Sequence, residues 1–326
     1  MENPSPLGVN TSSSLIYSDE IKGFAPIPSA ELQLQTVTAE PFFQVAKEPI
    51  ALEGPSYDRQ GNLLFVSVYE GLVYQLTPSL ELQIFYQDTK LAPAGIAIHK
   101  DGRVFIASVG DFHQGSVVAV DAQGRNPQEI VSTQSNFVPD DLVFDFDGGF
   151  YFTDFKGQST LAHGGVYYVS PDFSTTSVVL PNMAGANGVA LSPDGKVLWA
   201  TEFSASRLHR VELNNATTIA HFGATVPYHF VGRAPDSMRT DADGNVYVAM
   251  YHQGRILVFS PYGIPIGQIL LPGREKNQFL KSTSLAFFPG SSDLVIVSRD
   301  EVGGGGSMIF KAKGFAKGVN LFSHQT

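Results

Sequence analysis

The sequence predicts an all-β fold, a six-bladed β-propeller with four-stranded antiparallel blades. A polar turn that ends in glycine, followed by alternating β-branched and aromatic residues, occurs five times, and a weaker sixth copy lies around 289–297. The turn glycines are Gly61, Gly102, Gly148, Gly195 and Gly244. They lie 41, 46, 47 and 49 residues apart, a period typical of a propeller blade. Helical periodicity is scarce throughout, which favours strands for the remaining segments as well.

Residues 1–31 are predicted to form an N-terminal extension, because 1–30 are rich in Ser, Pro and Asn. Residues 32–326 are predicted to form a single propeller domain, since six related units follow one another without a linker. The segment 42–46 stands before the first blade, at a place where the other blade boundaries have an outer strand. We expect it to complete the last blade and so to close the ring without exposed sheet edges.

Within each blade, the strand after the turn is followed by a second alternating run. These runs lie at 72–76, 116–120, 166–169, 207–211, 255–259 and 308–311. A weaker strand follows most of them, for example at 83–86, 176–180 and 267–271. Together with the strand before each turn, these segments give four strands per blade.

Composition restricts the classes of partner. The formal charge is −10 and no basic cluster occurs, which argues against nucleic acid as a partner. No apolar run is long enough to span a membrane. The first residues lack the basic and apolar segments of a signal peptide, and the chain has no Cys, so a cytoplasmic location is expected. Disulfides, thiolate metal sites and a Cys nucleophile are excluded.

Equivalent positions in the repeat carry the functional signal. Five of them lie eight residues before the five turn glycines, and the sixth is the equivalent residue of the last blade. We call these six positions the anchors: Glu53, Ala94, Asp140, Asn187, Asp236 and, in the sixth blade, Thr283. The innermost strands of a propeller surround its axis, so residues at equivalent positions converge in space. The next residue is small in five of the six copies, and Asp141 is the exception.

The anchors predict a metal site. Three carboxylates held together without a cation would repel one another and raise one another's pKa, and a divalent ion removes that penalty. Carboxylate and amide oxygens suit Ca²⁺ better than Zn²⁺ or Mg²⁺. Ser237, next to Asp236, is a further candidate ligand. The alternative is that these residues cap strands or bond turns, which would scatter them among registers rather than place four at one register.

Two functions of different classes follow from such an ion. In the first, the ion polarises a carbonyl while a neighbouring carboxylate moves a proton to and from water, which is metal-assisted hydrolysis. In the second, the ion is structural and the propeller is a non-enzymatic, calcium-stabilised binding protein. The fold alone does not choose between them.

Several segments resemble signatures of the gluconolactonase and senescence-marker-protein (regucalcin-like) family. These are 53–55 (Glu-Gly-Pro), 187–195 (Asn-Gly-Val-Ala-Leu-Ser-Pro-Asp-Gly) and 235–238 (Pro-Asp-Ser-Met). Three more segments, 149–155, 164–173 and 314–318, are similar to the bacterial drug-responsive lactonase branch of that family. The similarity extends over about residues 32–323.

The resemblance implies a propeller that hydrolyses small-molecule lactones with a bound Ca²⁺. By that analogy Glu53, Asp140, Asn187 and Asp236 are metal ligands, and Asp236 is also the catalytic acid and base. The runner-up reaction is organophosphate or phosphotriester hydrolysis. Some members of the branch hold a second Ca²⁺. The corresponding stretches here, 110–116 and 132–133, contain one carboxylate, that of Asp111, so the presence of a second ion is left open. The sequence does not fix the oligomeric state.

Other polar and aromatic residues carry weaker signals. Asp154 and Glu202 end equivalent strands and could support the site, although strand-end turns are the commoner role. Loop histidines that could border the channel are His113, His229 and His252, and a loop His is usually a bystander. Aromatic residues that could line a substrate mouth, or equally pack in the core, are Phe112, Phe155, Tyr228 and Phe230. No Gly-x-Ser-x-Gly elbow occurs, which excludes the usual serine-esterase fold.

Overall fold

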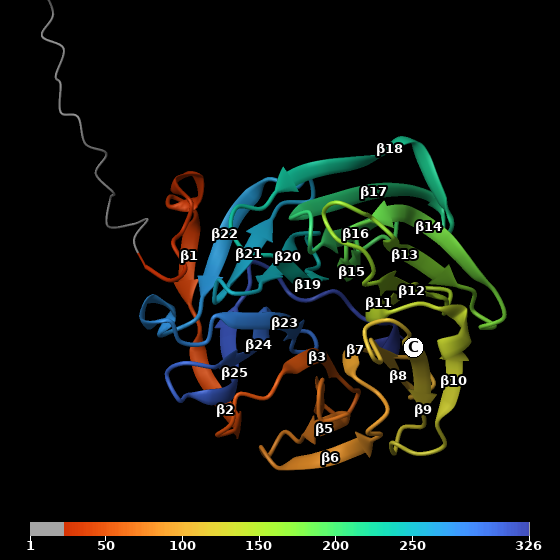
Figure 1. Ribbon diagram of the computed structural model, residues 1–326, viewed down its shortest axis with the longest axis horizontal. Helices are drawn as coiled ribbons and strands as arrows, with labels where there is room; N and C mark the ends of the chain where they lie inside the picture. The colour runs from red at the N-terminus through yellow and green to blue at the C-terminus, as the bar shows by residue number, and fades with distance from the viewer. Residues whose placement is uncertain (1–22, 326) are drawn as a thin grey trace, which may run out of the picture.

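The structure, a computed structural model, describes residues 23–325 and consists of six antiparallel sheets arranged around a central axis (Figure 1). The first three blades are β3 Leu52–Tyr57, β4 Leu63–Ser67, β5 Leu72–Leu76 and β6 Leu82–Gln87; β7 Pro93–Ile98, β8 Val104–Ser108, β9 Ser116–Val120 and β10 Gln128–Val131; β11 Pro139–Phe144, β12 Phe150–Asp154, β13 Gly164–Val169 and β14 Thr176–Met183. The six-bladed, four-stranded architecture predicted from the repeats is confirmed.

The remaining blades follow the same order from the axis outward. They are β15 Ala186–Leu191, β16 Val197–Glu202, β17 Arg207–Asn215 and β18 Thr218–His229; β19 Pro235–Thr240, β20 Val246–Met250, β21 Arg255–Phe259 and β22 Pro265–Leu270; β23 Lys281–Phe287, β24 Asp293–Asp300 and β25 Gly306–Lys313 with β2 Glu40–Ala46. Short 3₁₀ helices are η2 Ser29–Glu31, η3 Thr133–Ser135, η4 Arg274–Lys276 and η5 Phe322–His324.

The N-terminal chain closes the ring, as expected for 42–46. Strand β2 pairs antiparallel with β25 and is the outer strand of the sixth blade (Figure 1). One feature was not predicted: β1 Gln35–Thr38 adds to the outer edge of the fifth blade, parallel to β22. The N-terminal segment therefore covers the edges of two neighbouring blades, which leaves fewer unpaired backbone groups.

The predicted extension 1–31 is described in its last part. Residues 1–22, and Thr326 at the other end, lie outside the described residues. Glu31 is buried against the fifth blade, where its carboxylate pairs with Arg255 at 2.6 Å and accepts a hydrogen bond from the Tyr228 hydroxyl. The division of the chain at residue 31 stays a prediction.

The repeated turns form for a local reason. In the first blade the Asp58 carboxylate accepts hydrogen bonds from the N–H groups of Gln60 and Asn62, and Gly61 adopts a left-handed φ of 82°. Asp241 makes the same bonds to Asp243 and Asn245 in the fifth blade. The turn sets the register of the two strands that it joins, which is why its sequence reports the position of each blade.

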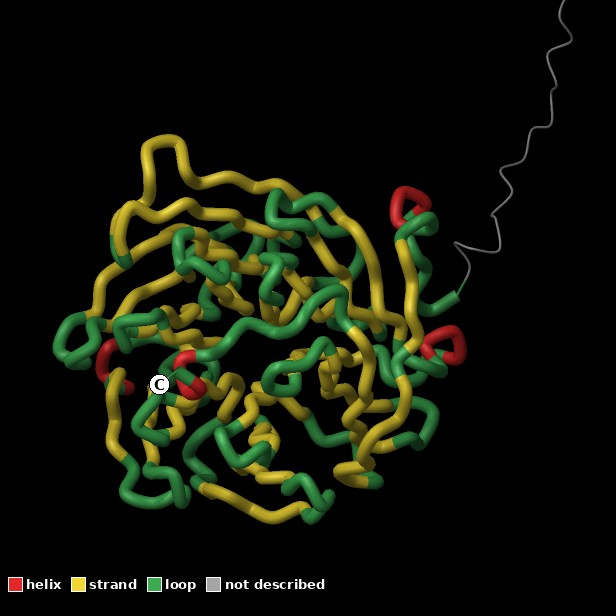
Figure 2. The backbone as a smooth tube through the Cα atoms, turned by 180° about the vertical axis from the view of Figure 1, so that it is seen from behind, coloured by secondary structure: helices red, strands yellow, loops and turns green. Residues whose placement is uncertain are grey.

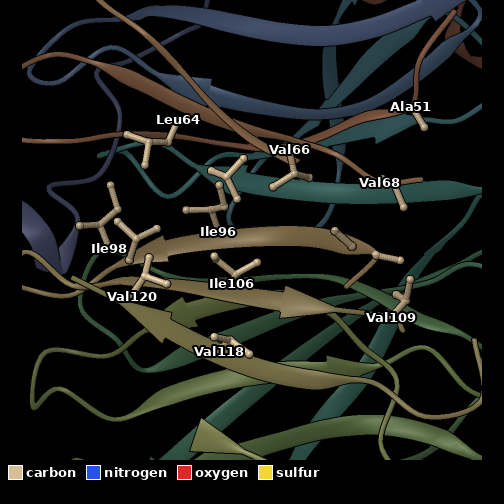
Figure 3. Close-up of a cluster of buried hydrophobic side chains, with 14 of the residues drawn as sticks. Ala51, Leu64, Val66, Val68, Ile96, Ile98, Ile106, Val109, Val118 and Val120 are labelled. Atoms are coloured by element: carbon tan, nitrogen blue, oxygen red, sulfur yellow. The ribbon is translucent and has the colours of Figure 1, made fainter. Parts of the chain in front are cut away.

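Side chains from facing sheets form the core between neighbouring blades. Between the first two blades, Leu64 and Val66 of β4 lie against Ile96 and Ile98 of β7, with Ile106 of β8 beside them (Figure 3). Similar apolar clusters lie between the other blades. Because every blade packs on two neighbours, the inner strands are held at a fixed distance from the axis.

The C-terminal segment crosses one face of the ring near its centre (Figure 2). It is tied to the fifth blade by the bond from the Ala242 N–H to the Lys317 carbonyl and to the first blade by Arg59, which donates to the Gln325 carbonyl. Phe322 is buried between these ties and stacks on Phe144. Within residues 23–325, no helix is long and apolar enough to cross a membrane.

Candidate metal centre

The anchors lie near the start of the innermost strands, which neighbour one another around the axis. Each of these six strands departs from regular pairing at its anchor, for example between Glu53 and Ser56 and between Pro235 and Met238. A bulge of this kind turns a side chain out of the plane of its sheet. The sequence repeat and the bulges therefore mark the same six positions.

Burial raises the pKa of all three anchor carboxylates, and the charges of other anchors add to this effect at Glu53 and Asp140. Glu53, Asp140 and Asp236 are 7, 8 and 5 % exposed. The pKa of Glu53 is raised well above its usual value by burial and then by the charges of Asp236 and Asp140. Burial and the Asp236 charge do the same to Asp140. Burial raises the pKa of Asp236 to about 8, although hydrogen bonds from Asn187 and from the Ser237 N–H oppose the increase.

Asn187 brings an unused acceptor to the same place. Its side chain is 4 % exposed, and its Oδ1 is buried without a hydrogen-bond partner among the described residues. A buried carbonyl oxygen without a donor is costly, and a cation would satisfy it. Within 23–325, no three His, Asp or Glu side chains form a metal cage by themselves. A hard cation at the anchors would thus depend on the Asn187 amide as well as on carboxylates.

The small residues after the anchors let neighbouring inner strands approach closely. A Cβ at Gly54 would lie 2.8 Å from the Ala94 carbonyl oxygen of the next blade, and one at Gly188 would lie 2.7 Å from the Asp236 carbonyl oxygen. Backbone atoms cannot give way as a flexible side chain can. The glycines therefore set the diameter of the anchor ring, which decides whether its oxygens can reach one ion.

Two threonines fasten the anchor strands to one another. Thr201 Oγ1 donates to the Asp236 carbonyl at 2.8 Å and accepts the Gly188 N–H at 2.7 Å. Thr153 makes the equivalent bonds to the Asn187 carbonyl and the Asp141 N–H one blade earlier. These threonines were not predicted, although the repeated Thr-acid-Phe triplets at 153–155 and 201–203 are a sequence signal for them.

Asp141, the exception to the small-residue rule, is neutralised across the channel. It is fully buried, and its Oδ2 lies 2.9 Å from Arg239 Nη1. Asp141 belongs to the third blade and Arg239 to the fifth, so the ion pair passes the fourth blade. The partnership was not predicted, because no local pattern links the two residues.

Comparison of the sequence with known protein families identifies the family. The SMP-30/gluconolactonase/LRE-like region model matches residues 52–299, which contain all six anchors. The chain belongs to this family. It is 50 % identical over 309 residues to the lactonase drp35 of Staphylococcus saprophyticus, covering 93 % of this chain and 95 % of that protein. It is 49 % identical to the lactonase drp35 of Staphylococcus aureus strain USA300 over 96 % of this chain and 98 % of that one.

Solved structures of other proteins share the fold. A regucalcin of Agrobacterium tumefaciens, described as a calcium-binding protein, superposes with a TM-score of 0.71 at 17 % identity, covering 87 % of this chain and 98 % of that one. A luciferin-regenerating enzyme gives a TM-score of 0.70 at 19 % identity over 86 % of this chain and 98 % of its own. At such identities the likeness shows the fold alone.

Within this fold, the Asp154 and Glu202 carboxylates each bind a backbone N–H of the chain that leads into an anchor strand. Asp154 accepts the Val138 N–H at 2.8 Å, and Glu202 accepts the Ala184 N–H at 2.7 Å. Glu202 is also paired with Arg207 at 2.9 Å and with His209 at 2.8 Å. These bonds join the end of a second strand to the chain just before the anchor. Both carboxylates therefore have a structural role at a strand end, which is the commoner of the two roles considered for them.

An aromatic and cationic rim lies next to the anchors. Phe155, Phe203 and Tyr251 directly follow equivalent strands, and their rings are in contact in sequence order at 5.4 and 5.9 Å between centroids. The Tyr251 hydroxyl accepts hydrogen bonds from Lys281 at 3.1 Å and from Arg299 at 3.3 Å. Lys281 stands two residues before the Thr283 anchor. We call these five residues the rim.

The other candidate residues are placed as follows. Tyr228 and Phe230 pack on Phe259 in the core between blades, not in a substrate mouth. Phe112 is exposed in the loop after β8. Burial and the nearby Lys281 and Arg233 lower the pKa of His252 to about 4, so its ring is neutral at neutral pH.

The loop considered for a second ion uses its own carboxylate. Asp111 Oδ1 accepts the N–H groups of His113 and Gln114, each within 2.9 Å. Ser132 Oγ caps the following 3₁₀ helix by accepting the Gln134 N–H. These bonds occupy one Asp111 oxygen and the Ser132 hydroxyl, which supports no second site there. Whether a second ion binds elsewhere is left open.

Proposed function

We propose that this protein is a Ca²⁺-dependent lactonase that acts on small-molecule cyclic esters, in the cytoplasm. The observation that carries the proposal is the anchor ring. Three buried carboxylates of raised pKa and one unsatisfied amide oxygen stand at one register of the fold. The relatives named lactonase cover nearly the whole chain and so support the same reaction class.

Glu53, Asp140, Asn187 and Asp236 would hold the ion, and Ser237 is a further candidate. Their donor set is all oxygen, with up to three negative charges, which fits a hard divalent cation and favours Ca²⁺. When bound, the ion would supply the positive charge that polarises an ester carbonyl and stabilises the charge that develops on its oxygen.

Asp236 is the proposed acid and base. Its Oδ1 accepts the Ser237 N–H at 3.1 Å and its carboxylate also accepts a hydrogen bond from Asn187, and these bonds hold the carboxylate in place. Oδ2 would remove a proton from the attacking water while the oxygen of that water bonds to the carbonyl carbon of the lactone. The same proton would then pass to the ring oxygen as the C–O bond breaks, which yields the open hydroxy acid.

The rim would position the substrate. The rings of Phe155 and Phe203 offer an apolar wall for the carbon skeleton of a lactone. The Tyr251 hydroxyl already accepts two cationic donors, so its own proton is available for a substrate oxygen.

A pH-indicator assay on a small lactone, its matched linear ester and a phosphotriester, each with and without chelator, tests the proposal. We expect lactone turnover that chelator abolishes and Ca²⁺ restores, with slower turnover of the linear ester. Faster phosphotriester turnover would favour the alternative hydrolase. No turnover together with Ca²⁺-dependent stability would leave a binding propeller and refute the lactonase proposal.

A further inference from the structure

The channel contains a cavity on the side of the C-terminal segment. Its volume is about 400 Å³, and none of the six anchors lines it. Its walls come from the last residues of the innermost strands, such as Phe144, Leu191 and Phe287, and its floor from the crossing segment 317–325. It is predominantly apolar, and nothing in the proposed hydrolysis uses it.

One register of the repeat builds this cavity. Three residues after each anchor, all six blades contribute a lining residue: Ser56, Ala97, Val143, Ala190, Arg239 and Ala286. Five of these side chains are small, so they leave the channel open at this level. The sixth is Arg239, which places a guanidinium at the level where the other five blades contribute uncharged side chains.

Arg239 has donors to spare. Its Nη1 serves both Asp141 Oδ2 at 2.9 Å and the Met238 carbonyl at 2.6 Å. The structure gives its Nε and Nη2 no hydrogen-bond partner among residues 23–325. The Asp141–Arg239 pair crosses from the third to the fifth blade, three residues past the Asp236 anchor, and so lies between the anchor ring and the cavity.

We propose that this cavity is a binding site, separate from the anchor ring, for an amphipathic small molecule with an apolar body and an anionic head that binds Arg239. The volume and apolar walls suit a compact ring system or a short chain. The guanidinium supplies a planar pair of donors for a carboxylate or sulfonate. The C-terminal segment, which forms the floor, would have to shift or be bypassed for entry.

Fluorescence and calorimetric titration of the Ca²⁺-loaded protein with anilinonaphthalene sulfonate tests this proposal. We expect one probe per chain. N-phenyl-1-naphthylamine, the same apolar body without the sulfonate, should bind at least about tenfold more weakly, the usual value of a charged hydrogen bond. The double variant Asp141→Asn with Arg239→Gln, which removes both charges together, should abolish that difference.

Position is tested by filling the cavity. Ala97→Phe should weaken probe binding at least about tenfold, because a phenyl ring occupies part of the space, whereas Ala224→Phe on the exposed face of β18 should not. Asn187→Ala should leave probe affinity unchanged, which separates this site from the metal centre whatever the reaction proves to be. Unaltered binding by a folded Ala97→Phe protein, or equal affinity for the two probes, would overturn the proposal.

Discussion

At the scale of single residues, Asp236 is the anchor for which we propose two roles, that of metal ligand and that of acid and base. Asp236→Asn keeps an oxygen for the ion but removes the proton acceptor and one charge. We expect Ca²⁺ to bind more weakly without being lost, and turnover at saturating Ca²⁺ to fall by about 10²–10⁴, the usual contribution of a positioned base. Lactone turnover and Ca²⁺-dependent melting measure the two effects.

Asp154→Asn is the matched control for that variant. Asp154 is also a buried carboxylate, but its Oδ1 accepts the Val138 N–H and so has a structural role. Its replacement should reduce turnover far less. Near-normal turnover of Asp236→Asn at high Ca²⁺ would instead make Asp236 a ligand alone, with Asp140 or the neutral His252 as the next candidates for the base.

Thr201 is expected to hold two anchor strands together. Thr201→Val keeps the shape but leaves the Gly188 N–H and the Asp236 carbonyl unsatisfied, so the free energy of unfolding should fall by about 1–3 kcal/mol. Ca²⁺ affinity should fall as well, because Asp236 is less firmly placed. Thr225→Val is the control, since that hydroxyl makes an exposed 3.3 Å bond to Arg210. Equal effects of the two changes on Ca²⁺ affinity would refute the role.

At the scale of the inner strands, the anchor carboxylates make stability depend on pH. Their folded pKa values lie above those of the unfolded chain, that of Asp236 at about 8. Without metal, the folded state therefore binds more protons than the unfolded state between about pH 4 and pH 8, so the free energy of unfolding falls as pH rises through that window. Saturating Ca²⁺ should remove much of this loss, because it stabilises the ionised carboxylates.

Thermal melting of stripped protein at several pH values between about 5 and 8, with and without Ca²⁺, measures this. We expect the Ca²⁺-induced increase in melting temperature to grow with pH. An increase of constant size over that range would mean that binding releases no protons, and hence that the anchor carboxylates are not the ligands. Glu53→Gln, which removes one titrating group, should reduce the pH dependence in the metal-free protein.

The strands were predictable because each blade repeats one turn and one bulged inner strand. The anchors followed from the same register, and the structure brings them to equivalent positions. Interactions between blades were not predictable in this way. Arg239 finds Asp141 98 residues earlier in the chain, and β1 joins β22 more than two hundred residues away, so neither has a local sequence signal. Phe230 was ambiguous, because an aromatic residue suits a core and a mouth equally.

At the scale of the whole molecule, the buried Glu31–Arg255 pair fastens the N-terminal segment to the fifth blade. Glu31→Gln leaves the Arg255 charge buried and unpaired, and we expect it to reduce the free energy of unfolding by about 3–5 kcal/mol. Replacing both residues by Leu and Met should cost much less, since no buried charge remains. Denaturant unfolding measures both variants, and similar losses for the two would show that the ion pair does not control this contact.

The central claim is that the anchors bind one hard ion on which lactone hydrolysis depends. Calorimetric titration of Ca²⁺ into metal-free protein, with lactone turnover followed over the same concentrations, tests it most directly. We predict one ion per chain at the anchors, turnover that rises with occupancy of that site, and affinity at least about tenfold lower in Glu53→Gln and Asn187→Ala. Unchanged Ca²⁺ affinity in both variants, or full turnover without a bound ion, would contradict the account.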